Sequence, residues 1–289
     1  MGLYIFSFLI SIIFWIWGIL KYDKYEREPL KSILFVFIVG GLISSIPAGI
    51  FNQAFIYLLY NLNDPQSSGA NGILKTLTFY GFVGINEEVC KVIATVLLIR
   101  NSKNFNEPAD ALIYSMTVGF GFSVFENIDY ATKLGLDTFF YRQLNAVPLH
   151  IGLATIWGMG IARAKFINKG KYFSTLVPYI FIAALLHFIY NFSVTLLNNS
   201  ILSLIVASII ALILILYSIR RLKFYQEESP FSNLLFCHHC GTGNNPDARL
   251  CYKCGQKIQL EFYNLCNNCN GKVDKSATFC YNCGSEQKI

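Results

Sequence analysis

The segment GFVGINEEVCKVIATVLLI, residues 81–99, places Glu87, Glu88 and Lys91 inside an apolar run that extends from residue 73 to 99. A charged side chain at the centre of a bilayer costs roughly 2.5–3.5 kcal/mol on insertion scales, and such residues usually serve a function. On one helix Lys91 lies four residues after Glu87 and three after Glu88, so it can neutralise part of the acidic pair. The pattern predicts a membrane helix that carries a polar site, and the alternative is an ion pair that only holds helices together.

The composition is typical of a membrane protein. Hydrophobic residues make up 54% of the chain, charged residues only 14%, and the mean hydropathy is +0.46. We expect an all-α polytopic membrane protein with about seven transmembrane helices, because seven apolar runs approach the ~20 residues that a span requires. These runs lie near residues 2–20, 31–60, 73–99, 109–128, 146–164, 173–197 and 200–219.

The basic residues predict the orientation of the spans. Lys and Arg accumulate on the cytoplasmic side of membrane proteins. Only Lys75, Lys133 and Arg142 fall on one side of the expected bilayer. The pattern predicts an extracytoplasmic N-terminus and a cytoplasmic C-terminus, because thirteen basic residues fall on the other side: Lys21, Lys24, Arg27, Lys31, Arg100, Lys103, Arg163, Lys165, Lys169, Lys171, Arg220, Arg221 and Lys223.

The C-terminal segment has a different composition, with eight cysteines in four CxxC pairs. Each half of the segment reads CxxC, ten residues, CxxC, and four thiolates in that arrangement suit a tetrahedral zinc ion. Four disulfides are disfavoured because the predicted topology places this segment in a reducing compartment. We therefore expect two structural zinc ions, a membrane domain at 1–222, a linker at 223–235 and a tandem zinc ribbon at 236–289. The expected ligands are Cys237, Cys240, Cys251, Cys254, Cys266, Cys269, Cys280 and Cys283.

The predicted ribbons do not have the charge of a nucleic-acid-binding module. Residues 224–289 carry six basic and six acidic side chains, whereas a phosphate-binding surface needs an excess of positive charge. We expect no nucleic acid and favour a cytoplasmic protein partner. His238 and His239 lie inside the first CxxC pair and are expected to be spacers, because four cysteines already complete the ligand set.

Five further polar residues lie in the expected spans. Each has an unremarkable explanation, either as an interfacial residue or as hydrogen-bonding partner between helices. Together with the acidic pair they supply the carboxylates, imidazoles and amides of a hydrolytic site. They are Glu126 and Asn127 near the end of the fourth span, His150 near the start of the fifth, and His187 and Asn191 on one face of the sixth.

The chain resembles the PrsW family of intramembrane proteases, which is related to the type II CAAX prenyl endopeptidases. The resemblance covers roughly residues 1–220 and includes His150 and His187-x-x-x-Asn191. It also includes Glu87-Glu88-x-x-Lys91 and the segment Gly119-Phe120-Gly121-Phe122-x-x-x-Glu126-Asn127. In the prenyl endopeptidases the latter motif ends in histidine, whereas here it ends in Glu126, as in the PrsW branch. The resemblance implies cleavage of a membrane-anchored protein, such as an anti-sigma factor, on the extracytoplasmic side.

Two mechanisms are compatible with these residues. In one, Glu126, His150 and His187, with or without one of the paired glutamates, hold a catalytic zinc. In the other, Glu87 or Glu88 activates water without a metal, and His187 and Asn191 position the water or stabilise the oxyanion. The family resemblance implies a metalloprotease.

A non-catalytic membrane receptor or scaffold is the rival interpretation, with an ion or ligand in the polar bundle. A transporter is a further alternative, because buried acids and histidines can relay protons. The protease motifs argue against both, and no inverted repeat is visible in the hydropathy.

Overall fold

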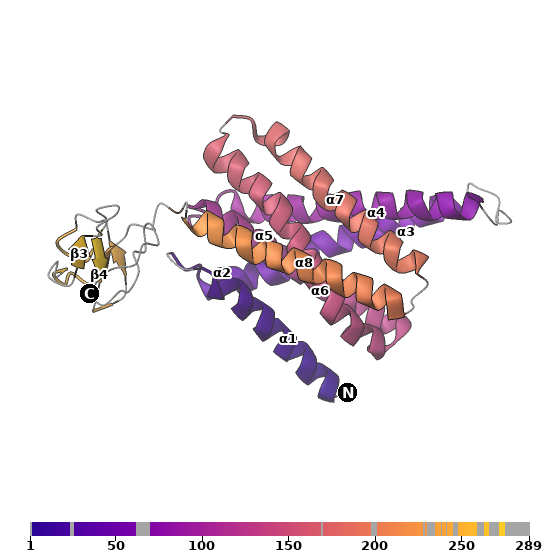
Figure 1. Cartoon of the computed structure of the whole chain (residues 1–289), viewed down its shortest axis with the longest axis horizontal. Helices are drawn as coiled ribbons and strands as arrows, with labels where there is room; N and C mark the ends of the chain where they lie inside the picture. The colour runs from indigo at the N-terminus through magenta and orange to yellow at the C-terminus, as the bar shows by residue number, and fades with distance from the viewer. Residues whose placement is uncertain are drawn as a thin grey trace. The chain divides into compact units, whose positions relative to one another are not determined.

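The computed structural model describes residues 2–23, 26–61, 70–168, 170–197, 201–227, 229, 235–237, 239–240, 242–244, 248–258, 263–265 and 272–274. The chain divides into a helical unit, residues 1–22 and 28–222, and a second unit, residues 23–27 and 223–289. Within the described residues the helical unit contains seven consecutive helical segments (Figure 1). They are α1 (Gly2–Lys21), the continuous run of α2 (Leu30–Phe35), η1 (Val36–Gly40) and α3 (Gly41–Asn61), α4 (Ala70–Ile99), α5 (Pro108–Leu134), α6 (Leu136–Ala162) with η2 (Arg163–Ile167), α7 (Tyr172–Leu196) and α8 (Ile201–Glu227).

This arrangement confirms the predicted all-α membrane fold. Among the described residues, five helical segments are long and apolar enough to cross a bilayer, namely 30–59, 108–134, 136–167, 172–196 and 201–227. Helix α1 contributes the shorter apolar stretch 9–21. Helix α4 does not meet the same criterion, as expected for a helix with charged side chains near its centre. The protein is therefore a multi-pass membrane protein.

The fourth and fifth helices are longer than the apolar runs suggested. Residues 129–145 were expected to lie between two spans, but α5 continues to Leu134 and α6 begins at Leu136. The exposed ion pair between Lys133 Nζ and Asp129 Oδ2, 2.7 Å apart, shows that α5 extends as a polar helix past its apolar part. The helix ends only at Gly135, whose φ of 97° favours glycine. His150 consequently lies near the middle of α6.

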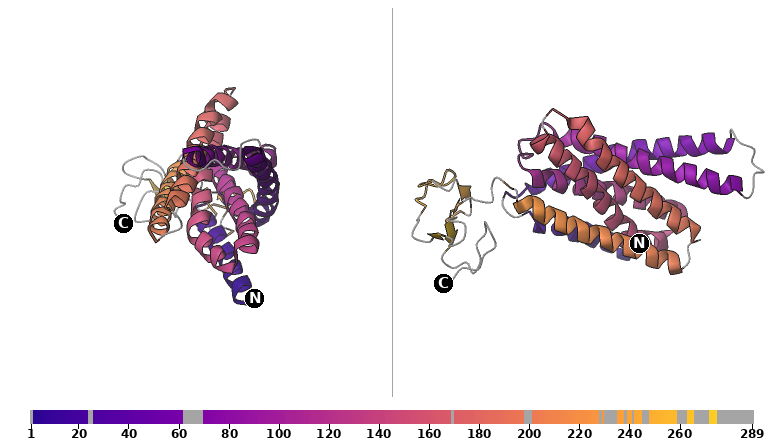
Figure 2. Two further views of the ribbon diagram at one scale, coloured as in Figure 1. Left: turned by 90° about the vertical axis from the view of Figure 1, so that its right-hand side faces the viewer. Right: turned by 45° about the horizontal axis from the view of Figure 1, so that its top comes forward.

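Helices α5 and α6 form the core of the helical unit. Both are largely buried, whereas the other candidate spans expose most of their apolar side chains, as lipid-facing helices do. Helix α5 begins with a capping box in which Glu107 and Asp110 accept hydrogen bonds from backbone N–H groups, and Pro108 occupies the first turn. Helices α3 and α4 pack together and extend past the other helices at one end (Figure 2).

Glycine allows the core helices to approach closely. A Cβ atom on Gly119 of α5 would lie 2.7 Å from the carbonyl oxygen of His150 and 2.7 Å from Ala154 Cβ on α6. A Cβ atom on Gly121 would clash with the backbone of Phe37 in η1. The two glycines of the Gly119-Phe120-Gly121 motif therefore set the distances from α5 to its neighbours on two sides.

The described part of the second unit contains two short antiparallel hairpins. Strand β1 (Leu235–Phe236) pairs with β2 (Gly243–Asn244), and β3 (Tyr263–Leu265) pairs with β4 (Lys272–Asp274). One hairpin falls in each half of the cysteine-rich repeat, as expected for two ribbons.

We predict that Gly119→Ala destabilises the helical unit by about 1–3 kcal/mol, the usual cost of overpacking a tight core. The new methyl group must push α6 away at His150. Gly81→Ala on α4 is the matched control, because no atom lies within 4 Å of its Cβ position. Thermal unfolding in detergent measures both variants, and equal melting temperatures for the two would contradict the packing argument.

Candidate functional site

Lys91 is the centre of a buried cluster formed by α4, α5 and α6. Its ammonium nitrogen Nζ lies 2.7 Å from Glu88 Oε1 and 2.8 Å from Nδ1 of His150. The same nitrogen lies 3.8 Å from Glu87 Oε2 and 4.0 Å from the centroid of the Phe122 ring. The Lys91 side chain is fully buried, so these contacts must replace its hydration.

Both carboxylate oxygens of Glu88 accept hydrogen bonds from other side chains. Its Oε1 accepts from Lys91 and lies 2.9 Å from Nδ1 of His187, and its Oε2 accepts from Nε1 of Trp157 at 2.9 Å. The carboxylate is completely buried. Glu88 thus joins α4, α6 and α7, and both of its oxygens already accept hydrogen bonds from protein groups.

Only one of the two carboxylate oxygens of Glu87 accepts a hydrogen bond from the described residues. Its Oε1 accepts a hydrogen bond from Nδ2 of Asn52 on α3 at 3.0 Å, and Asn86 in turn donates to Asn52 Oδ1 at 2.8 Å. Its Oε2 has no hydrogen-bond partner within the described part of the chain and lies 3.7 Å from Nε2 of His187. The two neighbouring glutamates therefore differ in what they can do chemically.

His150 connects the cluster to a second acidic group. Lysine can only donate, so Nδ1 of His150 accepts from Lys91 and Nε2 carries the proton. This Nε2–H donates to Glu126 Oε2 at 2.9 Å, and Nη2 of Arg142 donates to the same oxygen at 2.7 Å. Arg142 Nε also donates to Oδ1 of Asn127 at 2.7 Å.

The structure brings together seven of the eight residues that the sequence singled out: Glu87, Glu88, Lys91, Glu126, Asn127, His150 and His187. Asn191 lies one turn after His187 on α7, is partly exposed, and makes no hydrogen bond to this network in the described residues. Sequence reasoning missed Asn52 and Trp157. An amide in the apolar second run was a usable signal for Asn52, whereas a tryptophan in a span resembles any lipid-facing aromatic residue.

Three side chains of this cluster carry atoms that can ligate a metal ion. Ligand atoms of Glu87, His150 and His187 lie within 4.8 Å of one another, and all three side chains are buried. Each imidazole contacts a carboxylate through one nitrogen, which is the usual support of a metal-binding histidine. The other nitrogen of His150 accepts the hydrogen bond from Lys91, so His150 could ligate a metal only after Lys91 gives up this contact. The sequence grouped Glu126 with the two histidines, but the structure places Glu126 behind His150 and Glu87 beside His187.

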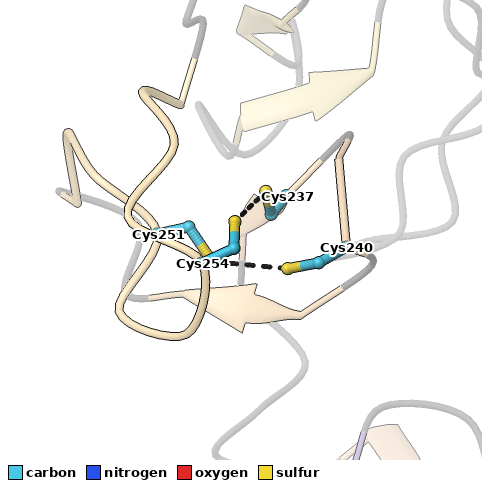
Figure 3. A group of neighbouring side chains, drawn as sticks. All are labelled: Cys237, Cys240, Cys251 and Cys254. Carbon is cyan, nitrogen blue, oxygen red and sulfur yellow. Dashed lines mark hydrogen bonds between the residues drawn. The ribbon is translucent and has the colours of Figure 1, made fainter.

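The first ribbon has the geometry of a zinc site. Ligand atoms of Cys237, Cys240, Cys251 and Cys254 lie within 4.8 Å of one another, and their side chains converge from two turns (Figure 3). The Sγ–Sγ distances are 3.7 Å for Cys237–Cys254 and 3.6 Å for Cys240–Cys251. A tetrahedral zinc ion with Zn–S bonds of ≈ 2.3 Å requires about 3.8 Å.

The local backbone favours the thiolate form of Cys251. Burial raises the pKa of the Cys251 thiol, but hydrogen bonds from the backbone N–H groups of Cys254 and Lys253 outweigh it and bring the pKa to about 6. His239 is exposed, in agreement with its expected role as a spacer. His238 and the predicted second ligand set, Cys266, Cys269, Cys280 and Cys283, lie outside the described residues.

Comparison with known proteins identifies both parts of the chain. Residues 28–218 match the model of the PrsW family intramembrane metalloproteases, and residues 237–284 match the double zinc ribbon model. The chain is 31% identical to Protease PrsW of Geobacillus kaustophilus over 58% of its own length and 69% of the relative. It is 28% identical to Protease PrsW of Clostridioides difficile over 64% of this chain and 76% of that one, and 27% identical to Protease PrsW of Bacillus subtilis over 61% and 76%.

No solved structure matches the chain. The family model covers well over half of the 289 residues and includes every member of the buried polar cluster. With a double zinc ribbon after its last membrane helix, the chain belongs to the PrsW family of intramembrane metalloproteases.

Proposed function

We propose that this PrsW-family protease uses Glu87 as the general base that activates water against a peptide bond of a membrane-anchored protein. The open Oε2 atom of Glu87 is the observation that carries the proposal. A general base needs a free oxygen within hydrogen-bond reach of the water that it deprotonates. Glu88 is the weaker candidate, because both of its oxygens already accept hydrogen bonds, Oε1 from Lys91 and His187 and Oε2 from Trp157.

The remaining residues have supporting roles in this scheme. Asn52 holds the second oxygen of Glu87, so the free oxygen keeps one direction. Lys91 and Glu88 orient the two histidines. Asn191 lies one turn from His187 on the same face of α7, and its side-chain amide is the donor that we assign to the developing oxyanion.

A metal ion would be held by Glu87, His150 and His187, the three residues whose ligand atoms converge. It would act as a Lewis acid on the scissile carbonyl group. In either mechanism the protein keeps the reacting groups in a dry, preorganised site. Glu88 and Glu126 fix the ring orientations of His187 and His150 in both cases.

The substrate is proposed to reach the site from the side of Glu126 and Arg142. These side chains are 18% and 17% exposed, whereas those of Glu88 and Lys91 are fully buried. The excess of basic residues at the opposite helix ends assigns the exposed side to the outside of the cell. The fitting substrate is a single-span protein, such as an anti-sigma factor, cut on its extracytoplasmic side. The zinc ribbons, in the cytoplasm, would bind a protein partner.

We predict that replacement of Glu87 lowers the cleavage rate, whereas replacement of Glu88 lowers the stability of the fold. Glu87→Gln should lower the cleavage rate by about 10²–10⁴-fold, the usual contribution of a general base, with little change in melting temperature. Glu88→Gln should destabilise the protein by about 3–5 kcal/mol, because it breaks a buried ion pair of Lys91. Cleavage of a purified single-span substrate and thermal unfolding separate the two effects, and full activity of Glu87→Gln would refute the assignment.

The predicted orientation can be checked with single cysteines in a chain that ends at residue 229 and lacks Cys90, because the other eight cysteines lie after residue 236. A cysteine placed between residues 62 and 69 should react with an impermeant maleimide in intact cells, since this segment follows the outward-running second span. A cysteine at Ser102 should react only after permeabilisation. The reverse pattern would invert the topology and move the cleavage site to the cytoplasmic side.

We predict that a 230–289 fragment binds two zinc ions and loses its structure when a strong chelator removes them. The fragment is too small to bury a sufficient apolar core, so metal binding must supply the folding free energy. Cys251→Ser should reduce the stoichiometry to one ion. A fragment that remains structured in chelator, or that binds one ion before mutation, would contradict this prediction.

A further inference from the structure

Arg142 has not been assigned a role in the reaction, yet it is bonded to the motif residues from outside the cluster. We propose that Arg142 is a positioning residue that fixes Glu126 and, through it, the ring of His150. The proposal rests on the hydrolytic function proposed above. Arg142 occupies the first half of α6, between the fourth and fifth apolar runs of the sequence.

The Arg142 guanidinium group is held at three points. Nη2 donates to Glu126 Oε2 and Nε donates to Asn127 Oδ1, both at 2.7 Å. The guanidinium carbon lies 3.9 Å from the centroid of the Tyr130 ring, in cation–π geometry. A planar group with fixed donors can make these contacts simultaneously, whereas the single ammonium nitrogen of lysine cannot reproduce them.

One oxygen transmits the position of Arg142 to His150. Glu126 Oε2 accepts both from Arg142 and from Nε2–H of His150, which lies 2.9 Å away. On its other side, the His150 ring accepts from Lys91. The ring is thus clamped between an ammonium group and a carboxylate, and the carboxylate has its own position set by Arg142.

The exposure of this pair distinguishes positioning from stabilisation. The Glu126–Arg142 ion pair is 17–18% exposed, so water can reach the Glu126 carboxylate when Arg142 is removed, and the loss of stability should be smaller than for the fully buried Glu88–Lys91 pair. His150 is only 1% exposed, so its Nε2–H has no solvent to replace Glu126 if the carboxylate turns away. Removal of Arg142 should therefore disturb His150 far more than it disturbs the fold.

The test uses the full-length protein with Arg142→Ala, Arg142→Lys and the control Lys133→Met, which removes an exposed ion pair from α5. Arg142→Ala should lower kcat at least tenfold, change KM less than twofold and shift the melting temperature by a few degrees at most. Arg142→Lys should recover only part of kcat. Lys133→Met should match the wild type.

A spectroscopic readout keeps the proposal separate from the hydrolytic function. In ¹⁵N-histidine-labelled protein, the ring nitrogen signals of His150, assigned with His150→Gln, should shift in both Arg142 variants and stay unchanged in Lys133→Met. In a Glu126→Gln background Arg142→Ala should cause no further shift of these signals. If the wild type cuts no substrate but these shifts occur, the positioning role stands and the hydrolytic function fails. Two results would overturn the proposal. One is unchanged His150 ring nitrogen signals in both Arg142 variants. The other is a shift of these signals by Arg142→Ala that is as large in the Glu126→Gln background as in the wild type.

Discussion

The buried ammonium group of Lys91 is the constraint on which the membrane unit depends. An uncompensated cation in an apolar bundle costs several kcal/mol, so the fold must supply acceptors from every side. Glu88 supplies one from the same helix and His150 supplies one from α6, while the ring of Phe122 on α5 lies over the group. The contacts of Lys91 therefore fix the positions of α5 and α6 relative to α4.

The close approach of α5 and α6 serves the same cluster. Gly119 faces the backbone carbonyl of His150, so a bulkier residue would separate the imidazole from its partners on α4 and α5. Trp157 lies two turns further along α6 and donates to Glu88. Gly119 on α5 and Glu88 on α4 thus both fix the position of α6, and with it the position of His150 in the polar cluster.

Much of this site could be predicted from the sequence because intramembrane charges have few uses. The spacing of Glu87, Glu88 and Lys91 placed them on one helical face, and the residue types of His150 and His187 pointed to the same hydrolytic chemistry. The different roles of the two glutamates could not be predicted. They depend on Asn52 and Trp157, which reach the pair from other helices and look ordinary in their own runs.

The helix ends between the fourth and fifth spans could not be predicted from the apolar runs, for a related reason. Hydropathy detects where a helix is apolar, but α5 continues as an exposed polar helix to Leu134. Arg142 lies between the two apolar runs, so the sequence alone indicates only its charge and not its place on α6. The same effect places His150 deeper in its helix than the apolar run implied.

The coupling between Lys91 and Glu88 tests the central role of the ammonium group most directly. Thermal unfolding in detergent would be measured for Lys91→Met, Glu88→Gln and the double variant. Each single change should cost about 3–5 kcal/mol, because it leaves a buried charge without its partner, and the double variant should be more stable than the sum of the losses predicts. Small and additive losses would contradict the account, since they would mean that the fold does not depend on this cation.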